Sequence, residues 1–152
     1  MAVAPADPGD DALQSLRAAG LRVTMPRQAV LTWLAGHPHS TAEAIGAGVR
    51  EQFGAISIQA VYDVLATCTD AGILRRIQPA GHSARFERRA GDNHHHAVCR
   101  RCGRTEDVDH VTGDRPCLTP DDGQGFTVDE AEVVFWGACP ACAAADGHAT
   151  GA

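Results

Sequence analysis

Residues 57–88 read SIQAVYDVLATCTDAGILRRIQPAGHSARFER, and the order of elements predicted there decides the fold. The first part is typical of a helix, because Ser57 can cap its start and Gly72 can end it. Apolar residues at helical spacing are expected to share one buried face, and they are Ile58, Val61, Leu65 and Cys68. Two strand-like runs, residues 73–78 and 84–88, flank a Pro-Ala-Gly turn at residues 79–81. The sequence therefore predicts a helix followed by a β-hairpin.

Three more helices are predicted before this stretch, each with recognisable end signals. The first is expected at Asp11–Ala19, with Gly20 past its end. Thr24 can cap the second, with Pro26 in its first turn and Gly36 after its end, and a Ser40–Glu43 capping box opens the third. Short helices followed by a hairpin are typical of a winged helix-turn-helix, which binds DNA. The alternative is a helical core with an unrelated hairpin.

The rear of the chain has a different pattern. Residues 91–93, Gly-Asp-Asn, resemble a hinge, and an irregular stretch covers residues 111–125. Three strands are expected, at His95–Val98, Thr105–Asp109 and Phe126–Trp136. The predicted class is α+β. The expected parts are a disordered tail (1–11), a winged-helix DNA-binding domain (12–90), a hinge (91–93), a dimerisation and metal-binding domain (94–142) and a second disordered tail (143–152).

Charge is distributed unevenly along the 152 residues, whose net charge is −6. Residues 12–104 carry a net charge of +6 and residues 105–152 a net charge of −9. A basic front half indicates a partner that is an anion. No apolar run approaches the ~20 residues of a membrane helix, and no secretory signal is evident, so we expect a cytoplasmic protein without a membrane partner.

Two C-x-x-C pairs predict a structural zinc site. They are Cys99–Cys102 and Cys139–Cys142, with 36 residues between them. Two such pairs supply the four sulfurs of a closed tetrahedral site, which has no open position for catalysis. The alternatives are disulfides, which are rare in the cytoplasm, and thioredoxin-like redox pairs, which normally open a helix in a βαβ unit. Cys68 is expected in the core, and Cys117 is either inert or a reactive thiol.

A run of three histidines precedes the first cysteine pair. On a strand, His94 and His96 would point to one side and His95 to the other. Two imidazoles on one face indicate a second metal site, with nitrogen and oxygen donors that suit Fe(II), Mn(II), zinc or nickel. The alternatives are a solvated histidine run and a metalloenzyme centre. Against the enzyme, no nucleophile or general-base motif accompanies the cluster.

Taken together, these motifs resemble those of the ferric uptake regulator family. The matching stretches are GLRVTMPRQ (20–28), VYDVL (61–65), DNHHHAVCRRCG (92–103) and WGACPAC (136–142). Within the family, the chain is most similar to actinobacterial peroxide- or iron-responsive repressors linked to catalase-peroxidase. The resemblance implies a homodimer with an N-terminal winged helix and a C-terminal α/β dimerisation domain.

The resemblance also implies roles for individual residues. Regulatory metal ligands fall on His39, Glu87, His94, His96 and Asp107. DNA contacts fall on Arg22, Arg27, Ser57, Gln59 and Tyr62. The expected cofactors are structural Zn(II) and regulatory Fe(II) or Mn(II), and the expected partner is double-stranded DNA. We expect a non-enzymatic repressor of AT-rich palindromic operators that releases DNA when peroxide oxidises the iron site, inserting oxygen into His39 or His94.

Four departures from the family pattern bear on this expectation. Asp63 follows Tyr62 where many relatives carry Arg or Asn, so the bases that are read can differ. Glu87 matches iron sensors, whereas Asp107 matches peroxide sensors. Residues 111–125 lack the usual apolar helix, and Ala131 replaces a histidine of a third metal site, which is therefore not expected. The alternatives are a sensor of iron, zinc or nickel supply on the same scaffold, and thiol-based sensing through Cys68 or Cys117.

Overall fold

The computed structural model describes residues 7–88, 94–108, 124–127 and 132–145. The chain divides into two compact units, Met1–Asp92 and Asn93–Ala152. The first is mainly helical with a small sheet, and the second is built on a three-stranded sheet, so the described residues have the α+β character expected. Within the described residues, no helix has both the length and the hydropathy to cross a membrane.

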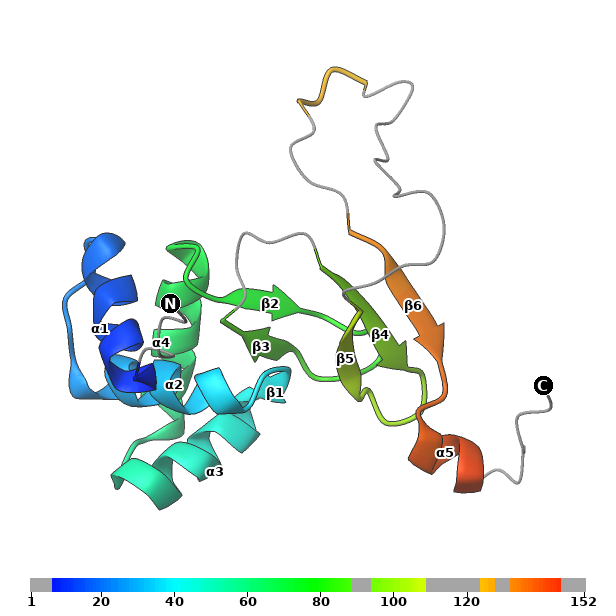
Figure 1. Cartoon of the computed structure of the whole chain (residues 1–152), viewed down its shortest axis with the longest axis horizontal. Helices are drawn as coiled ribbons and strands as arrows, with labels where there is room; N and C mark the ends of the chain where they lie inside the picture. The colour runs from blue at the N-terminus through cyan, green and yellow to red at the C-terminus, as the bar shows by residue number, and fades with distance from the viewer. Residues whose placement is uncertain (1–6, 89–93, 109–123, 128–131, 146–152) are drawn as a thin grey trace, which may run out of the picture. The chain divides into compact units, whose positions relative to one another are not determined.

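Four helices form the core of the first unit (Figure 1). They are α1 (Pro8–Ala18), α2 (Met25–Gly36), α3 (Ala42–Phe53) and α4 (Ile58–Asp70). Each helix buries one apolar stripe against the others, which is how an amphipathic helix gains most of its stability. The largest fully buried apolar side chains include Leu16, Leu31, Leu34, Ile45 and Leu65.

Two of the three predicted helix caps are confirmed. The hydroxyls of Thr24 and Ser57 accept from the backbone N–H three residues on, as predicted. The capping box on Ser40 is wrong, because the residue that caps α3 is Thr41, whose hydroxyl accepts from the N–H of Ala44. The first helix begins at Pro8, capped by Asp7, so residues 8–11 are helical rather than part of a disordered tail.

Helix α4 buries a slightly different face from the one predicted. Val61, Leu65 and Cys68 are buried as expected, and Val64 joins them. The prediction for Ile58 is wrong, since its side chain is 44% exposed. Ile58 is the first residue of the helix and lies at the edge of its buried face.

The predicted hairpin forms and gains a third strand. Strands β2 (Arg75–Ile77) and β3 (Arg85–Glu87) pair antiparallel, and the turn between them is closed by a bond from the N–H of His82 to the carbonyl of Pro79. On the other edge of β3 lies β1 (Ser40–Thr41), which the sequence did not indicate. This short strand ties the start of α3 to the hairpin, so the wing is anchored to the helices.

The second unit is a sheet in the order β5-β4-β6 followed by a short helix. Strand β4 (His95–Cys99) pairs antiparallel with β5 (Thr105–Val108) and parallel with β6 (Val134–Gly137). The third strand is therefore shorter than predicted, and Phe126, assigned to it from the sequence, is 82% exposed outside any strand. Helix α5 (Pro140–Ala145) also corrects the prediction that disorder begins at Ala143.

Candidate metal centres and nucleic-acid interface

The four cysteines of the two pairs meet at one end of the second unit. Cys99 ends β4, and the tight turn that follows is closed by a bond from the N–H of Gly103 to the carbonyl of Cys99. Gly103 has φ +71°, a left-handed conformation that glycine adopts without steric cost. Cys139 and Cys142 lie at the start of α5, and the N–H of Arg100 donates to the carbonyl of Gly137, which joins the two turns. Sheet pairing thus brings together pairs that are far apart in the sequence.

The spacing of these sulfurs fits a tetrahedral zinc ion. All four Sγ atoms lie within 4.8 Å of one another, and Cys102 Sγ is 3.8 Å from Cys139 Sγ. Sulfurs bound at about 2.3 Å to a tetrahedral zinc lie about 3.8 Å apart. None of the four is in a disulfide. The residues present therefore fit the ion, which would bind four thiolates and have no open coordination position.

Neighbouring groups shift the pKa values of two of these thiols in opposite directions. Backbone N–H groups, first that of Cys102 and then that of Cys139, lower the pKa of Cys99 to about 6. The pKa of Cys142 is raised to about 12, mainly because its thiol is hydrogen-bonded to the sulfurs of Cys139 and Cys102. Gathering several thiolates is unfavourable without a cation between them, so zinc binding would release protons from this cluster.

The structure also bears on the other two cysteines and on the alternative of a redox pair. Cys68 is fully buried in the helical core, as predicted, and burial raises the pKa of its thiol. Cys117 lies outside the described residues. The Cys139 pair does open a helix, contrary to the sequence analysis, but α5 has only six residues and follows β6 rather than forming a βαβ crossover. The cluster of four sulfurs distinguishes this pair from a redox centre.

Three candidate ligands of the second metal site converge within the second unit. His94 and His96 point to the same side, are both buried, and have Nε2 atoms 3.1 Å apart. Asp107 lies opposite His96 on β5, with its Oδ1 atom 3.5 Å from His94 Nε2 and 3.7 Å from His96 Nε2. His95 points elsewhere, and its Nδ1 accepts from the N–H of Val133. The arrangement offers two imidazoles and a carboxylate to one ion.

Two more candidate ligands meet within the first unit. His39 Nε2 lies 2.8 Å from Glu87 Oε2, and both side chains are buried. His39 has φ +57°, a left-handed conformation that is uncommon outside glycine, and its carbonyl accepts from the guanidinium of Arg85. Backbone strain of this kind persists only where the surrounding structure enforces it, and it often marks functional positions.

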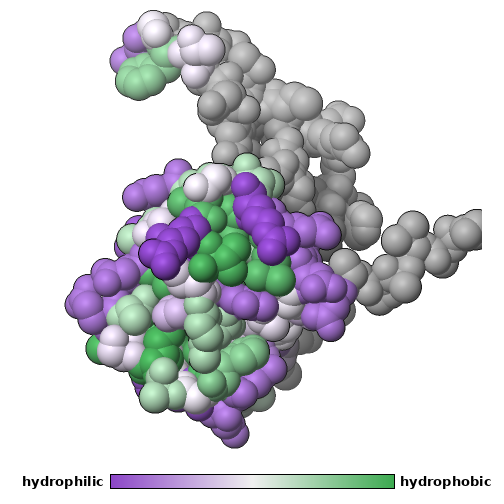
Figure 2. All heavy atoms as spheres, turned by 90° about the vertical axis from the view of Figure 1, so that its left-hand side faces the viewer, coloured by the Kyte–Doolittle hydropathy of each residue, from purple (hydrophilic) through white to green (hydrophobic). Residues whose placement is uncertain are grey.

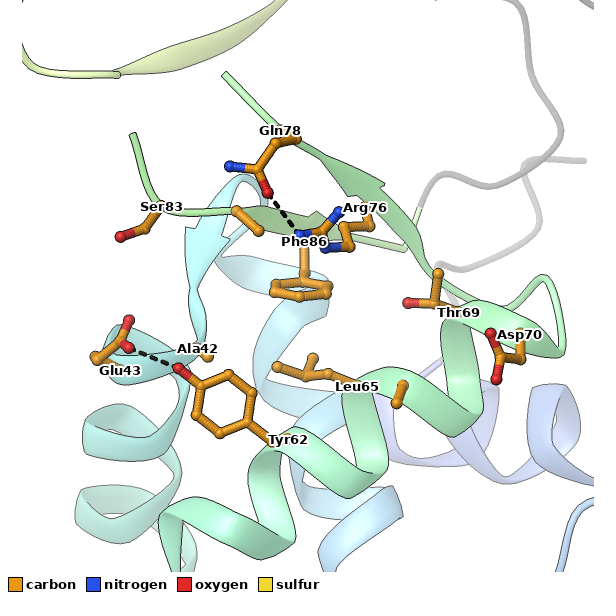
Figure 3. Close-up of a pocket in the computed structure, with 12 residues that line it drawn as sticks. Ala42, Glu43, Tyr62, Leu65, Thr69, Asp70, Arg76, Gln78, Ser83 and Phe86 are labelled. Carbon is orange, nitrogen blue, oxygen red and sulfur yellow. Dashed lines mark hydrogen bonds between the residues drawn. The ribbon is translucent and has the colours of Figure 1, made fainter. Parts of the chain in front are cut away.

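Helix α4 carries the expected DNA contacts Gln59 and Tyr62, so we call it the proposed reading helix, and both side chains form hydrogen bonds within the protein. Tyr62 is 45% exposed and donates from its hydroxyl to Glu43 Oε1 on α3, at 2.8 Å (Figure 3). Gln59 donates to Asp63 one turn further along the helix. The hydrogen bond to Tyr62 is the main reason that the pKa of Glu43 is lowered, and the same bond raises the pKa of Tyr62. A pocket of about 500 Å³ lies beside Tyr62, between α4 and the hairpin.

The remaining DNA candidates lie at two helix starts. Arg22 is exposed just before α2, and its carbonyl accepts from the guanidinium of Arg27, in the first turn. Ser57 caps α4, so one lone pair of its hydroxyl is engaged with the N–H of Ala60. On the face of the helical unit seen in Figure 2, apolar side chains in the middle are surrounded by hydrophilic ones.

Sequence reasoning missed two acidic residues next to these sites. Glu43 was assigned only to a helix cap, yet its carboxylate bonds to Tyr62. Glu132, which lies just before β6, accepts from His96 Nδ1 at 2.7 Å. Helix and strand periodicity gave no signal for either contact, because each joins residues on separate elements.

Comparison with known proteins supports the same reading of the chain. The family model described as "Ferric uptake regulator family" matches residues 18–134. The chain is 54% identical to the transcriptional regulator FurA of Mycobacterium tuberculosis over 136 residues, covering 90% of this chain and 92% of the relative. It is 30% identical to the peroxide-responsive repressor PerR of Staphylococcus epidermidis, covering 88% and 89%.

A solved structure agrees in fold. The ferric uptake regulator from Pseudomonas aeruginosa with manganese superposes with a TM-score of 0.69 at 27% identity, covering 85% of this chain and 98% of that one. The order of an N-terminal DNA-binding domain and a C-terminal dimerisation domain is thus shared. Because the family model covers most of the chain and its relatives align along nearly their full length, this chain belongs to the ferric uptake regulator family, whose members are metal-responsive transcriptional regulators and not enzymes.

Proposed function

We propose that this chain is a homodimeric repressor that binds AT-rich palindromic operators when Fe(II) or Mn(II) is bound and releases them when peroxide reacts at the iron-loaded site. The observation that carries the proposal is the convergence of His94, His96 and Asp107 on one buried point of the second unit. In the first unit, His39 and Glu87 form a second pair of metal-type donors. The family resemblance assigns both groups of donors to the same regulatory ion.

The chemistry of these donors supports iron or manganese. Imidazole nitrogens and carboxylate oxygens suit Fe(II) and Mn(II), whereas a thiolate-seeking ion would prefer the cysteine cluster. An ion bound by both units would favour the arrangement of the DNA-binding domain in which all ligands reach it. Such an ion shifts the protein toward the DNA-binding state only to the extent that it binds that state more tightly.

Bound Fe(II) would activate peroxide beside the imidazole rings, and in the net change the electrons that reduce the peroxide would come from the ring that is oxidised. In the net change, one peroxide oxygen enters a carbon–hydrogen bond of His39 or His94, and the other oxygen leaves as water. The modified ring binds metal poorly, so the two units would no longer share the ion. The zinc-bound cysteines would be spared, because zinc has no redox chemistry.

Two features of the chain support peroxide rather than metal supply as the signal. Asp107 matches peroxide-sensing members, and the chain is similar along most of its length to a peroxide-responsive repressor. Glu87 favours the alternative, a sensor of iron supply, because iron-sensing members carry Glu at this position. Both functions use Fe(II) on the same scaffold, and the response of the iron-loaded protein to peroxide distinguishes them, so the experiment compares the iron form with a manganese form.

The test measures operator binding by fluorescence anisotropy with zinc-loaded protein carrying either Fe(II) or Mn(II). Brief peroxide treatment should abolish binding by the iron form and leave the manganese form intact. Tandem mass spectrometry should place one added oxygen on His39 or His94 and none on His37, an exposed histidine in the same peptide region. Equal loss of binding in both metal forms, with oxidation confined to cysteine, would instead establish thiol sensing.

DNA contacts are tested separately. Arg22→Ala should weaken operator binding and reduce the slope of its salt dependence by about one unit, as expected for one lost cationic contact. Tyr62→Ala should relax base preference with little change in that slope. If both variants bind operator like the parent protein, α4 is not the reading helix.

A further inference from the structure

We propose that Glu132 is a positioning residue for the regulatory metal, because it fixes the tautomer and ring orientation of His96. The inference rests on the proposed function, in which His96 is a ligand. It concerns a carboxylate that the family motifs do not include and that lies 36 residues from its partner in the sequence. All the groups involved belong to the second unit.

The two ring nitrogens of His96 have different partners. Its Nδ1 is 2.7 Å from Glu132 Oε1, whereas its Nε2 faces His94 Nε2 at 3.1 Å and Asp107 Oδ1 at 3.7 Å. A carboxylate can only accept, so the proton of a neutral ring must be on Nδ1. The lone pair is then on Nε2, which is the nitrogen directed at the other candidate ligands.

Backbone hydrogen bonds hold His96 and Glu132 in place. His96 is completely buried, and its backbone N–H donates to the carbonyl of Val133, next to Glu132 in the chain. The N–H of Val133 in turn donates to the side chain of His95. These bonds continue the parallel pairing of β4 with β6 and keep the carboxylate beside the ring. Since the side chain of Glu132 is 39% exposed, its carboxylate remains hydrated and its negative charge carries little desolvation cost.

The contact between Glu132 and His96 would strengthen metal binding. A carboxylate that accepts from the non-ligating nitrogen of a histidine increases the basicity of the ligating nitrogen and prevents the wrong tautomer. Loss of such a partner typically lowers metal affinity by about 10- to 100-fold. Glu132 would therefore tune the concentration of metal at which this regulator binds DNA, without touching the ion.

The test titrates zinc-loaded protein with Mn(II), followed by electron paramagnetic resonance. Glu132→Ala should weaken Mn(II) binding by about 10- to 100-fold. Glu132→Gln should retain most of the affinity, because its amide oxygen still accepts from Nδ1. The matched control is Glu106→Ala, which removes the same charge from the same sheet at a side chain paired with Arg104, and which should bind Mn(II) like the parent.

A second readout needs no regulatory metal. Nitrogen-15 NMR of the zinc-loaded, manganese-free protein should show His96 with its proton on Nδ1 in the parent and in Glu132→Gln, and a mixture of tautomers in Glu132→Ala. An unchanged tautomer in Glu132→Ala would overturn the inference, as would unchanged Mn(II) affinity. If instead His96→Ala binds Mn(II) as tightly as the parent, the proposed regulatory site fails, and the tautomer measurement still decides the role of Glu132.

Discussion

Tyr62 is the single tyrosine in the chain, so its ionisation can be followed in the intact protein. Its hydroxyl donates to Glu43, and this bond, together with desolvation and the nearby negative charge, raises the pKa of Tyr62. We predict that Glu43→Ala shifts phenolate formation to lower pH. The measurement is ultraviolet absorbance during an alkaline titration, with circular dichroism confirming that the fold persists over the range used.

Asp63→Asn is the matched control, because Asp63 bonds to Gln59 and not to Tyr62. It removes a charge from the same surface and should leave the titration of Tyr62 almost unchanged. If Glu43→Ala titrates like the parent protein, the hydrogen bond between Tyr62 and Glu43 does not persist in solution.

The same pair leads to a prediction for DNA binding. Glu43→Gln keeps an acceptor for Tyr62 and removes a negative charge beside the proposed reading surface. Operator affinity at low salt should therefore rise severalfold, while base preference stays the same, since exposed charges act mainly through a screened field. Glu43→Ala should relax base preference as well, because Tyr62 loses its support. Anisotropy titrations with operator and single-base variants separate the two effects.

Helices α2 and α3 approach each other closely at Gly48. A β-carbon at this position would lie 2.2–2.4 Å from ring atoms of Trp33, whose ring is stacked on His37 with centroids 4.0 Å apart. We predict that Gly48→Ala destabilises the first unit by about 1–3 kcal/mol, the usual cost of overpacking. Urea denaturation followed by tryptophan fluorescence measures the change.

Gly36, the last residue of α2, provides the control, because nothing lies within 4 Å of a β-carbon built there. Alanine at that position should be neutral or stabilise the protein by up to about 1 kcal/mol. A Gly48→Ala protein as stable as Gly36→Ala would show that the ring of Trp33 moves aside freely.

The start of α3 offers a direct comparison of two possible caps. Thr41→Ala should cost about 1 kcal/mol, since the N–H of Ala44 loses its acceptor. Ser40→Ala removes only a bond to the carbonyl of His37. Hydrogen exchange at the amide of Ala44 should therefore accelerate in Thr41→Ala alone. Acceleration in Ser40→Ala instead would restore the capping box read from the sequence.

The two units differ in how they are stabilised. The main apolar core lies within the helical unit, whereas the buried hydrophobic residues described in the second unit are Val98 and Cys99. Small units with little core usually depend on metal or on association. Binding at a structural zinc contributes roughly 10–16 kcal/mol, which is also folding energy.

We therefore predict that chelating zinc, or Cys99→Ser, unfolds the second unit and dissociates the proposed homodimer while the helical unit stays folded. Hydrogen exchange should show lost protection in β4, β5 and β6 and retained protection in α2 and α4. Sedimentation and zinc analysis provide the second measurement. A Cys99→Ser protein that stays dimeric with full zinc content would contradict this account.

Local signals determined a large part of this protein. The caps Thr24 and Ser57, the turn at residues 79–81 and the alternation of His94 and His96 follow from bonds and periodicities within a few residues. The two cysteine pairs indicated zinc because each pair is itself a short-range motif. These features were predictable since the groups that interact are neighbours in the chain.

Tertiary structure decided the contacts between elements. Strand β1 exists because β3 offers it an edge, and Thr41 rather than Ser40 is the cap because this strand runs to Thr41 and α3 begins only at Ala42. Glu43 reaches Tyr62 across 19 residues, and Glu132 reaches His96 across 36. Exposed carboxylates look alike in a sequence, and their partners are fixed only when packing brings separate helices and strands within hydrogen-bonding distance.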